Sequence, residues 1–331
     1  MAGLMSVAKL AGVSRATAAR AFSAPTLLRK DTLNKVIAAS QQLGFRPNRI
    51  AQQLRTQSTH IIGVLVPTLC NPVFAEQLQA MVNVAQHHGY SLLIAVTDYQ
   101  SQQEVNIVED MLRQQVDGLI MTVADANNSP VLKMLANEDI PVVLVHNPPL
   151  KTGISTIGVD NYSAIYELTH YLQQLGHRHI GMLTGPIHQS DRARDRYQGY
   201  CQAMNHLDLR AMPLIEMPKH TQSSFSVLAP HLQGRQRLTA LICSNDLLAL
   251  STIGCLMRAG YQVPQQVSIV GFDGIELGQD LFPSLCSVVQ PRYELGRQAI
   301  ASLIGLLSGQ KPVAKVLSHY LRLGESISPP E

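Results

Sequence analysis

Arg15 and Arg20 lie in a segment whose pattern predicts a short helix, and Ala16 and Ala19 stand on the same face. A helix that projects two guanidinium groups past methyl-sized neighbours can enter the major groove of DNA. Arginine makes bidentate contacts there with guanine O6 and N7. A helical hairpin with a solvated basic face carries the same residues, so the pattern alone leaves both interpretations open.

A second group of polar side chains follows a series of apolar runs further along the chain. Ligands of open α/β sheets bind outside the carboxyl ends of the strands, and fixed donors and acceptors beside an aromatic ring suit a polyhydroxylated ligand. Some of these residues have structural alternatives, such as a helix cap, a turn or a salt-bridged helix face. The candidates are residues 67–74 with the ring of Phe74, His146, Asn147, residues 191–196, Asn245, Asp246, residues 271–274 with Asp273, and Gln290.

The arginine-bearing segment is the second half of a predicted helix-turn-helix over residues 7–22. Each helix has a serine that can cap it, and a glycine in the left-handed conformation is expected between them. Apolar residues at helical spacing predict one buried face on each helix. The caps, inner-face residues and glycine are Ser6, Val7, Leu10, Ala11, Gly12, Ser14, Ala18, Ala21 and Phe22.

A third helix is predicted with Leu33, Val36 and Ile37 as its inner stripe, and it ends at Gly44. The short segment that follows, residues 49–55, has one apolar side but cannot hold a helix alone in water. We expect it to be a linker that orders only when something packs against it.

The rest of the chain alternates short Val/Ile/Leu runs with amphipathic helical segments. Continuous apolar runs of this kind predict parallel strands buried on both faces, in a doubly wound α/β body. The length of this part and a break near residues 156–161 favour two lobes. The runs cover residues 60–67, 90–96, 117–123, 140–146, 178–185, 238–244 and 267–273.

The charge of the chain is unevenly distributed. Residues 1–60 carry nine Lys or Arg and one acid, whereas the remainder carries 17 Lys or Arg and 22 acids. A basic head on a weakly acidic body is typical of a nucleic-acid-binding protein.

Other classes of protein find no support in the sequence. No run of 18 apolar residues or signal sequence is present, so we expect a cytoplasmic protein with no membrane partner. The five scattered cysteines predict neither disulfides nor a metal site. No catalytic, nucleotide-binding or zinc-protease motif occurs, and we expect neither an enzyme nor a cofactor.

Ordered motifs along nearly the whole chain resemble the lactose/galactose repressor family of bacterial transcription regulators. Among them are VAKLAGVSRAT (7–17), LGFRPNRIAQQLRT (43–56), NPVFAE (71–76), GVDNYSA (158–164), ARDRYQGY (193–200), NDLLALS (245–251) and VSIVGFDGI (267–275). The resemblance implies a helix-turn-helix head at 1–46, a hinge helix at 47–59 and a periplasmic-binding-protein-like body at 60–331. The lobes of that body would comprise about 60–157 with 289–317, and about 158–288 with 318–331.

The resemblance also implies which residues contact DNA. Arg15, Ala16 and Arg20 match base-reading positions, Ser14 and Thr17 match phosphate-contacting positions, and Leu54 matches a wedge between base steps. The other hinge residues implied in DNA binding are Asn48, Arg49, Gln53 and Arg55. Two departures, Ala18 in the core and Arg29 in place of a capping serine, imply a less stable head.

For the ligand, the resemblance implies a small sugar effector that switches operator binding by a homodimer, possibly a dimer of dimers. The matching positions are Asn71, Phe74, Arg194, Asn245, Asp273 and Gln290, with His146 and Asn147 departing from the usual Asp-Arg pair. A sugar phosphate, a nucleoside and a gluconate-type sugar acid, held by a cationic His146, remain alternatives. A remote alternative for the function is a sugar-binding component of a transport system.

Overall fold

The computed structural model describes residues 3–45, 58–150 and 153–330. The chain divides into two compact units, a head that ends at Thr59 and a body that begins at His60. The predicted hinge residues Asn48, Arg49, Gln53, Leu54 and Arg55 lie outside the described residues.

The head contains three α-helices around a small core. They are α1 (Leu4–Ala11), α2 (Arg15–Ser23) and α3 (Lys30–Gln42), with a 3-10 turn at Pro25–Leu27. Val7, Ala18 and Val36 are fully buried where the helices meet. Gly12 has a φ of 64° and ends α1, because only glycine adopts this left-handed conformation without strain.

The start of the first helix was predicted incorrectly. Gly3, not Ser6, is the N-cap of α1, and Ser6 lies inside the helix. Leu10 was assigned to the inner face but is 48% exposed, whereas Ala8 is buried. The cause is the earlier start, since Leu4 then shares a face with the buried pair at the following turn.

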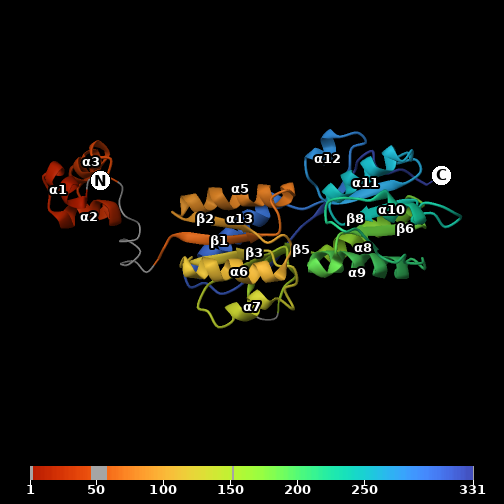
Figure 1. Cartoon of the computed structure of the whole chain (residues 1–331), viewed down its shortest axis with the longest axis horizontal. Coiled ribbons are helices and arrows are strands. Elements are labelled where there is room, and N and C mark those ends of the chain that lie inside the picture. The colour runs from red at the N-terminus through yellow and green to blue at the C-terminus, as the bar shows by residue number, and fades with distance from the viewer. Residues whose placement is uncertain (1–2, 46–57, 151–152, 331) are drawn as a thin grey trace. The chain divides into compact units, whose positions relative to one another are not determined.

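The first lobe of the body is a six-stranded parallel sheet in the order β11-β5-β4-β3-β1-β2. Helices α5 (Pro72–His87) and α13 (Arg292–Leu307) pack on one face, and α6 (Ser101–Arg113) and α7 (Pro130–Leu135) on the other (Figure 1). The strands are β1 (Ile61–Val66), β2 (Ser91–Val96), β3 (Gly118–Met121), β4 (Val142–Val145), β5 (Ser155–Val159) and β11 (Ala314–Leu317).

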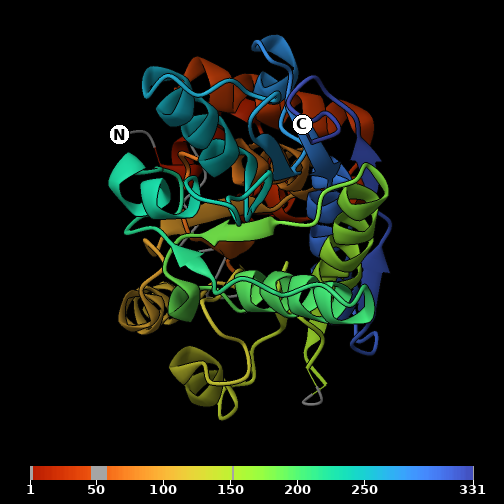
Figure 2. The same ribbon diagram turned by 90° about the vertical axis from the view of Figure 1, so that its right-hand side faces the viewer.

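The second lobe has the same design, with the sheet order β12-β10-β9-β8-β6-β7. Helices α8 (Asn161–Gln174) and α9 (Asp191–His206) cover one face, and α10 (Phe225–Leu228) and α11 (Asp246–Arg258) the other (Figure 2). The strands are β6 (Ile180–Thr184), β7 (Ile215–Glu216), β8 (Ala240–Cys243), β9 (Ser268–Asp273), β10 (Cys286–Val289) and β12 (Tyr320–Arg322). The remaining short elements are Ile187–Gln189, Ala229–His231 and α12 (Leu277–Asp280).

All seven predicted strand runs are strands, and the doubly wound class is confirmed. The chain passes from the first lobe to the second within the expected break at residues 156–161, because β5 of the first sheet ends at Val159 and Asp160 caps α8 of the second lobe. β12 departs from the parallel rule, since it pairs antiparallel with β10. Among the described residues, no helix is long and apolar enough to cross a membrane.

Candidate functional site

A small cavity of about 50 Å³, here called the inner cavity, lies between the two lobes of the body. Both lobes contribute to its wall, so a ligand held there would contact both at once. The residues that line it are Asn71, Val73, Phe74, Tyr99, His146, Ser190, Arg192, Ala193, Arg196, His220, Ser244, Asn245, Asp273 and Gln290.

Asp273 is the carboxylate of the inner cavity. It is the last residue of β9 and has a φ of 120°, a strained conformation for a residue with a side chain. Its oxygens accept hydrogen bonds from Asn71 Nδ2 at 3.1 Å and from Gln290 Nε2 at 2.7 Å. Burial raises the pKa of Asp273, while the charge of Arg196 opposes this shift. The carboxylate is therefore oriented by protein amides before any ligand arrives.

Three helices begin at the wall of the inner cavity. Asn71, Ser190 and Asn245 are the N-caps of α5, α9 and α11, and each side chain accepts a backbone N–H of its own helix. Asn245 also donates from Nδ2 to the carbonyl of His220 at 2.8 Å. The side chain of Asn245 is thus occupied at both ends, although the residue lies at the predicted place. The positive ends of the three helix dipoles surround the cavity.

Two buried arginines on α9, Arg192 and Arg196, line the inner cavity, one helical turn apart. The Arg196 guanidinium lies 3.5 Å from the ring centroid of Phe272 and donates to Asn161 Oδ1 at 2.8 Å and to the Ser244 carbonyl. Burial lowers the pKa of Arg196 to about 10, so the group stays charged at neutral pH.

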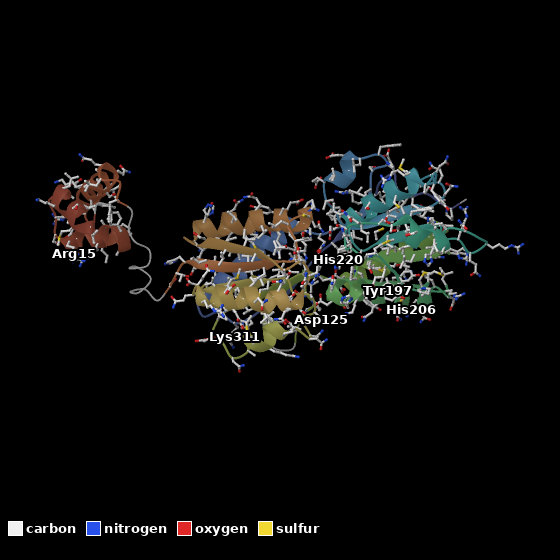
Figure 3. The ribbon with its side chains drawn as sticks, viewed as in Figure 1. Arg15, Asp125, Tyr197, His206, His220 and Lys311 are labelled. Atoms are coloured by element: carbon white, nitrogen blue, oxygen red, sulfur yellow. The ribbon has the colours of Figure 1, made fainter. Side chains whose placement is uncertain are left out.

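The structure places Arg194, predicted as an effector contact, outside the inner cavity. Its guanidinium forms an ion pair of 2.7 Å with Asp125 of the first lobe, and it does not line the inner cavity. Asp125 lies where the two lobes meet (Figure 3). The physical reason is helical periodicity, because residues two apart on a helix point to different faces.

His146 lines the inner cavity as predicted, but it is not cationic. Its Nε2 is 2.9 Å from Gln77 Oε1, and its ring lies edge-on to Phe74. Burial, with the charges of Arg192 and Arg196, lowers the pKa of His146 to about 3. In this structure His146 is therefore a neutral hydrogen-bonding group of the cavity wall.

Asn147 does not line the inner cavity and has a structural role instead. Its amide accepts from the backbone N–H of Val123 at 3.0 Å and donates to Val123 O at 2.8 Å and to Asp191 Oδ2 at 2.8 Å. Asp191 also accepts from the backbone N–H of Ala126 at 3.0 Å. These bonds, which join α9 to the ends of β3 and β4, close the lobes against each other.

Tyr99 and His220, which no sequence pattern singled out, stack across the two lobes with their ring centroids 3.9 Å apart. Tyr99 follows β2, so the strand-end rule applied to that strand would have found it. His220 follows β7, a strand of two residues that carries no recognisable pattern. His220 is labelled at the junction of the lobes in Figure 3. Burial, then the charge of Arg192, lowers the pKa of His220 to about 4.

The head presents a second candidate surface on α2. Arg15, Ala16 and Arg20 are exposed, while Ala18 and Ala21 on the opposite side are buried in the core. Ser14 caps the helix, since its Oγ accepts from the backbone N–H of Thr17 at 3.0 Å. Figure 3 labels Arg15 on this helix. The basic face is thus free of contacts with the helices of the head.

Two family profiles match this arrangement. Residues 4–48 match the profile described as bacterial regulatory proteins, lacI family. Residues 59–317 match periplasmic binding proteins and the sugar binding domain of the LacI family. The chain belongs to the LacI family. LacI-family proteins with both parts are transcriptional regulators, and the head and the two-lobed body described above have the matching architecture.

Relatives and solved structures agree with LacI-family membership over almost the whole chain. The transcriptional repressor CytR of Escherichia coli (strain K12) is 31% identical, with 93% of this chain and 91% of CytR aligned. The transcriptional regulator GntR of the same strain is 33% identical over 98% of this chain and 97% of its own. The lac repressor dimer bound to operator and an anti-inducer has a TM-score of 0.86 at 25% identity, covering 99% of each chain.

Proposed function

We propose that this protein is an operator-binding transcriptional repressor whose affinity for DNA is controlled by a small polyhydroxylated ligand, a sugar or sugar derivative. It acts as a homodimer on a palindromic operator in the bacterial cytoplasm, and it performs no catalysis. The observation that carries the proposal is Asp273, oriented by Asn71 of one lobe and by Gln290 in a cavity that both lobes enclose.

The head supports the DNA-binding part of the proposal. Its exposed Arg15, Ala16 and Arg20 form a helix face suited to base edges in the major groove, and Ser14 and Thr17 lie at the start of the same helix. We assign base reading to the first three and phosphate contacts to the last two. The predicted hinge contacts remain part of the proposal.

The body supports the ligand-binding part. We assign the ligand to the inner cavity, with Asp273 accepting from hydroxyl groups and Arg196 replacing Arg194 as the donor from α9. The other proposed contacts are Asn71, Phe74, His146, Asn245, Gln290, Tyr99 and His220.

The two lobes supply a means of control. Bonds from Asp191 and the ion pair of Arg194 with Asp125 hold the lobes closed in this structure. A ligand that favours one degree of closure can bias the head through the hinge with a coupling free energy of about 1–3 kcal/mol. The proposal does not depend on whether the ligand releases or promotes DNA binding.

The first test is a titration of the purified protein against short palindromic duplexes with a central CG step. We expect binding that weakens steeply with salt and that changes when the ligand is added. Binding that is undetectable for every sequence, or insensitive to salt, would contradict the proposal.

A second test uses Arg20→Ala. We expect the variant to lose base preference at one position of each half-site, at a cost of about 1–3 kcal/mol, while ligand binding is unchanged. Lys35→Ala is the matched control, because Lys35 is an exposed cation on α3, away from the basic face. Equal effects of the two substitutions on base preference would show that α2 does not read the operator.

A further inference from the structure

We infer that the ligand of the inner cavity carries an anionic group, a carboxylate or a phosphate, on its polyhydroxylated frame, and that Arg192 selects this group. The inference rests on the proposed function, because it specifies the chemical class of the ligand that the body binds. Arg192 was not singled out by the sequence, in which it is one of three arginines between residues 191 and 196.

Two guanidinium groups, Arg192 and Arg196, line the cavity, and Asp273 is the one carboxylate among the described residues of its wall. Asp191 Oδ1 forms an ion pair of 3.1 Å with Arg192 Nη1, while Asp191 Oδ2 accepts from Ala126 and Asn147 of the first lobe. Asp191 therefore offsets charge on Arg192 from one side, but it contacts only Nη1 of the guanidinium.

Arg192 retains unused hydrogen-bond donors. Both of its bonds to the protein use Nη1, which donates to Val123 O at 2.8 Å and to Asp191 Oδ1 at 3.1 Å. Nε and Nη2 have no acceptor among the residues that the structure describes, although the side chain is only 7% exposed. A guanidinium presents its donors as a planar fork, so the free edge can hold a carboxylate or phosphate through two parallel bonds.

Asp273 offsets the charge of Arg196 but leaves the free edge of the Arg192 guanidinium open. Its oxygens are taken by the amides of Asn71 and Gln290, and it forms no ion pair with Arg192 or Arg196 within the described chain. We therefore assign different parts of the ligand to the two groups, with hydroxyls at Asp273 and the anion at Arg192.

The histidines of the cavity respond to the same positive field. The charge of Arg192 contributes to lowering the pKa of both His146 and His220, which are neutral at physiological pH. The N-termini of α5, α9 and α11 add to the field, since each contributes a partial positive charge at the cavity wall. An anion at the free edge of Arg192 would lie near these helix N-termini and be stabilised by them, whereas a neutral sugar would gain less.

The test compares matched ligands on the full-length protein by titration calorimetry. Gluconate and galactonate represent the carboxylate, glucose 6-phosphate and galactose 6-phosphate the phosphate, and glucose and galactose the neutral frame. We expect at least one anion to bind about tenfold or more tightly than its neutral partner, because the added bonds are charge-assisted. Whether the sugar acids or the sugar phosphates bind more tightly identifies the anionic group as a carboxylate or a phosphate.

Arg192→Gln should weaken the preferred anion by about tenfold or more and leave its neutral partner unchanged. Arg210→Gln removes the same charge from an exposed position just after α9, outside the cavity, and should retain the preference. Arg192→Lys keeps the charge without the fork, so a weaker preference should persist even if the glutamine variant folds poorly.

Equal or tighter binding of the neutral sugar by the wild type, or an undiminished preference in a folded Arg192→Gln protein, overturns the inference. Binding of neutral sugars alone leaves the proposed function standing. Failure of every compound to bind overturns both the anionic ligand and the carbohydrate class.

Discussion

Replacement of Arg29 by serine should stabilise the DNA-binding head. Arg29 is the N-cap of α3, with an extended φ and ψ of −62° and 140°, yet its side chain makes no capping hydrogen bond. The same backbone position in α2 is held by Ser14, whose Oγ accepts from the backbone N–H of Thr17 at 3.0 Å. A serine at position 29 has a compatible backbone, and its Oγ can accept from the N–H of Thr32, which in this structure donates to the carbonyl of Arg29 at 3.0 Å.

The expected gain is about 1 kcal/mol, since replacing a capping serine by alanine costs 0.5–2 kcal/mol. Loss of a cation from the positive end of the helix dipole adds about 0.3–1 kcal/mol. Arg29→Ala is the matched control, because it removes the cation without supplying a cap. The difference between the two variants therefore isolates the capping hydrogen bond.

Hydrogen exchange of full-length protein, followed by mass spectrometry, measures this difference in the α3 peptides. About 1 kcal/mol corresponds to roughly fivefold slower exchange when opening is at equilibrium. Exchange in α3 that is no slower in Arg29→Ser than in Arg29→Ala would refute the reasoning. Peptides from the body serve as an internal reference, because they belong to a separate compact unit.

Two further substitutions test the body. Gly271→Ala should lower the free energy of unfolding by about 2–4 kcal/mol in denaturant titrations, because the new Cβ would clash with Asp246 Oδ1 and come within 2.9 Å of Leu285. Gly254→Ala is the control and should be near neutral, because its Cβ meets only the end of the Arg258 side chain, at 3.2 Å. Similar losses of stability in both variants would contradict this reasoning. Glu104→Gln should alter the dependence of stability on pH, since burial raises the pKa of Glu104 to about 7. Below the unfolded-state pKa of about 4, the Glu104 carboxyl is protonated in both the folded and the unfolded protein. As the pH rises to about 7, the carboxyl ionises in the unfolded protein first, so the free energy of unfolding of the wild type falls by on the order of 3 kcal/mol. The glutamine variant cannot ionise at this position and keeps this stability. A constant difference between the two proteins from pH 5 to pH 8 would refute that assignment.

Patterns among neighbouring residues were enough to predict many of the helices and strands. The runs later seen as β1 and β9 are continuous and apolar, as buried parallel strands require, and Gly12 and Ser14 fixed the turn of the head. The N-cap of α1 was misplaced because Ser6 matches the sequence pattern of a capping residue, although the helix begins one turn earlier, after Gly3. β5 was missed because Ser155–Val159 begins with two polar residues and contains a glycine, so it forms no continuous apolar run; its pairing with β4 and β11 makes it a strand.

The sequence by itself determined the class of the protein, since helical and strand periodicities are local and the basic charge is confined to the head. It also determined that polar residues collect where parallel strands end. Only the tertiary structure decided which of them share the cavity. Arg192 and Arg196 line the inner cavity and Arg194 does not, because one face of α9 is turned to the cavity between the lobes while another is turned to Asp125 of the first lobe. The neutrality of His146 and the pairing of Tyr99 with His220 likewise depend on burial between two lobes, which no local pattern encodes.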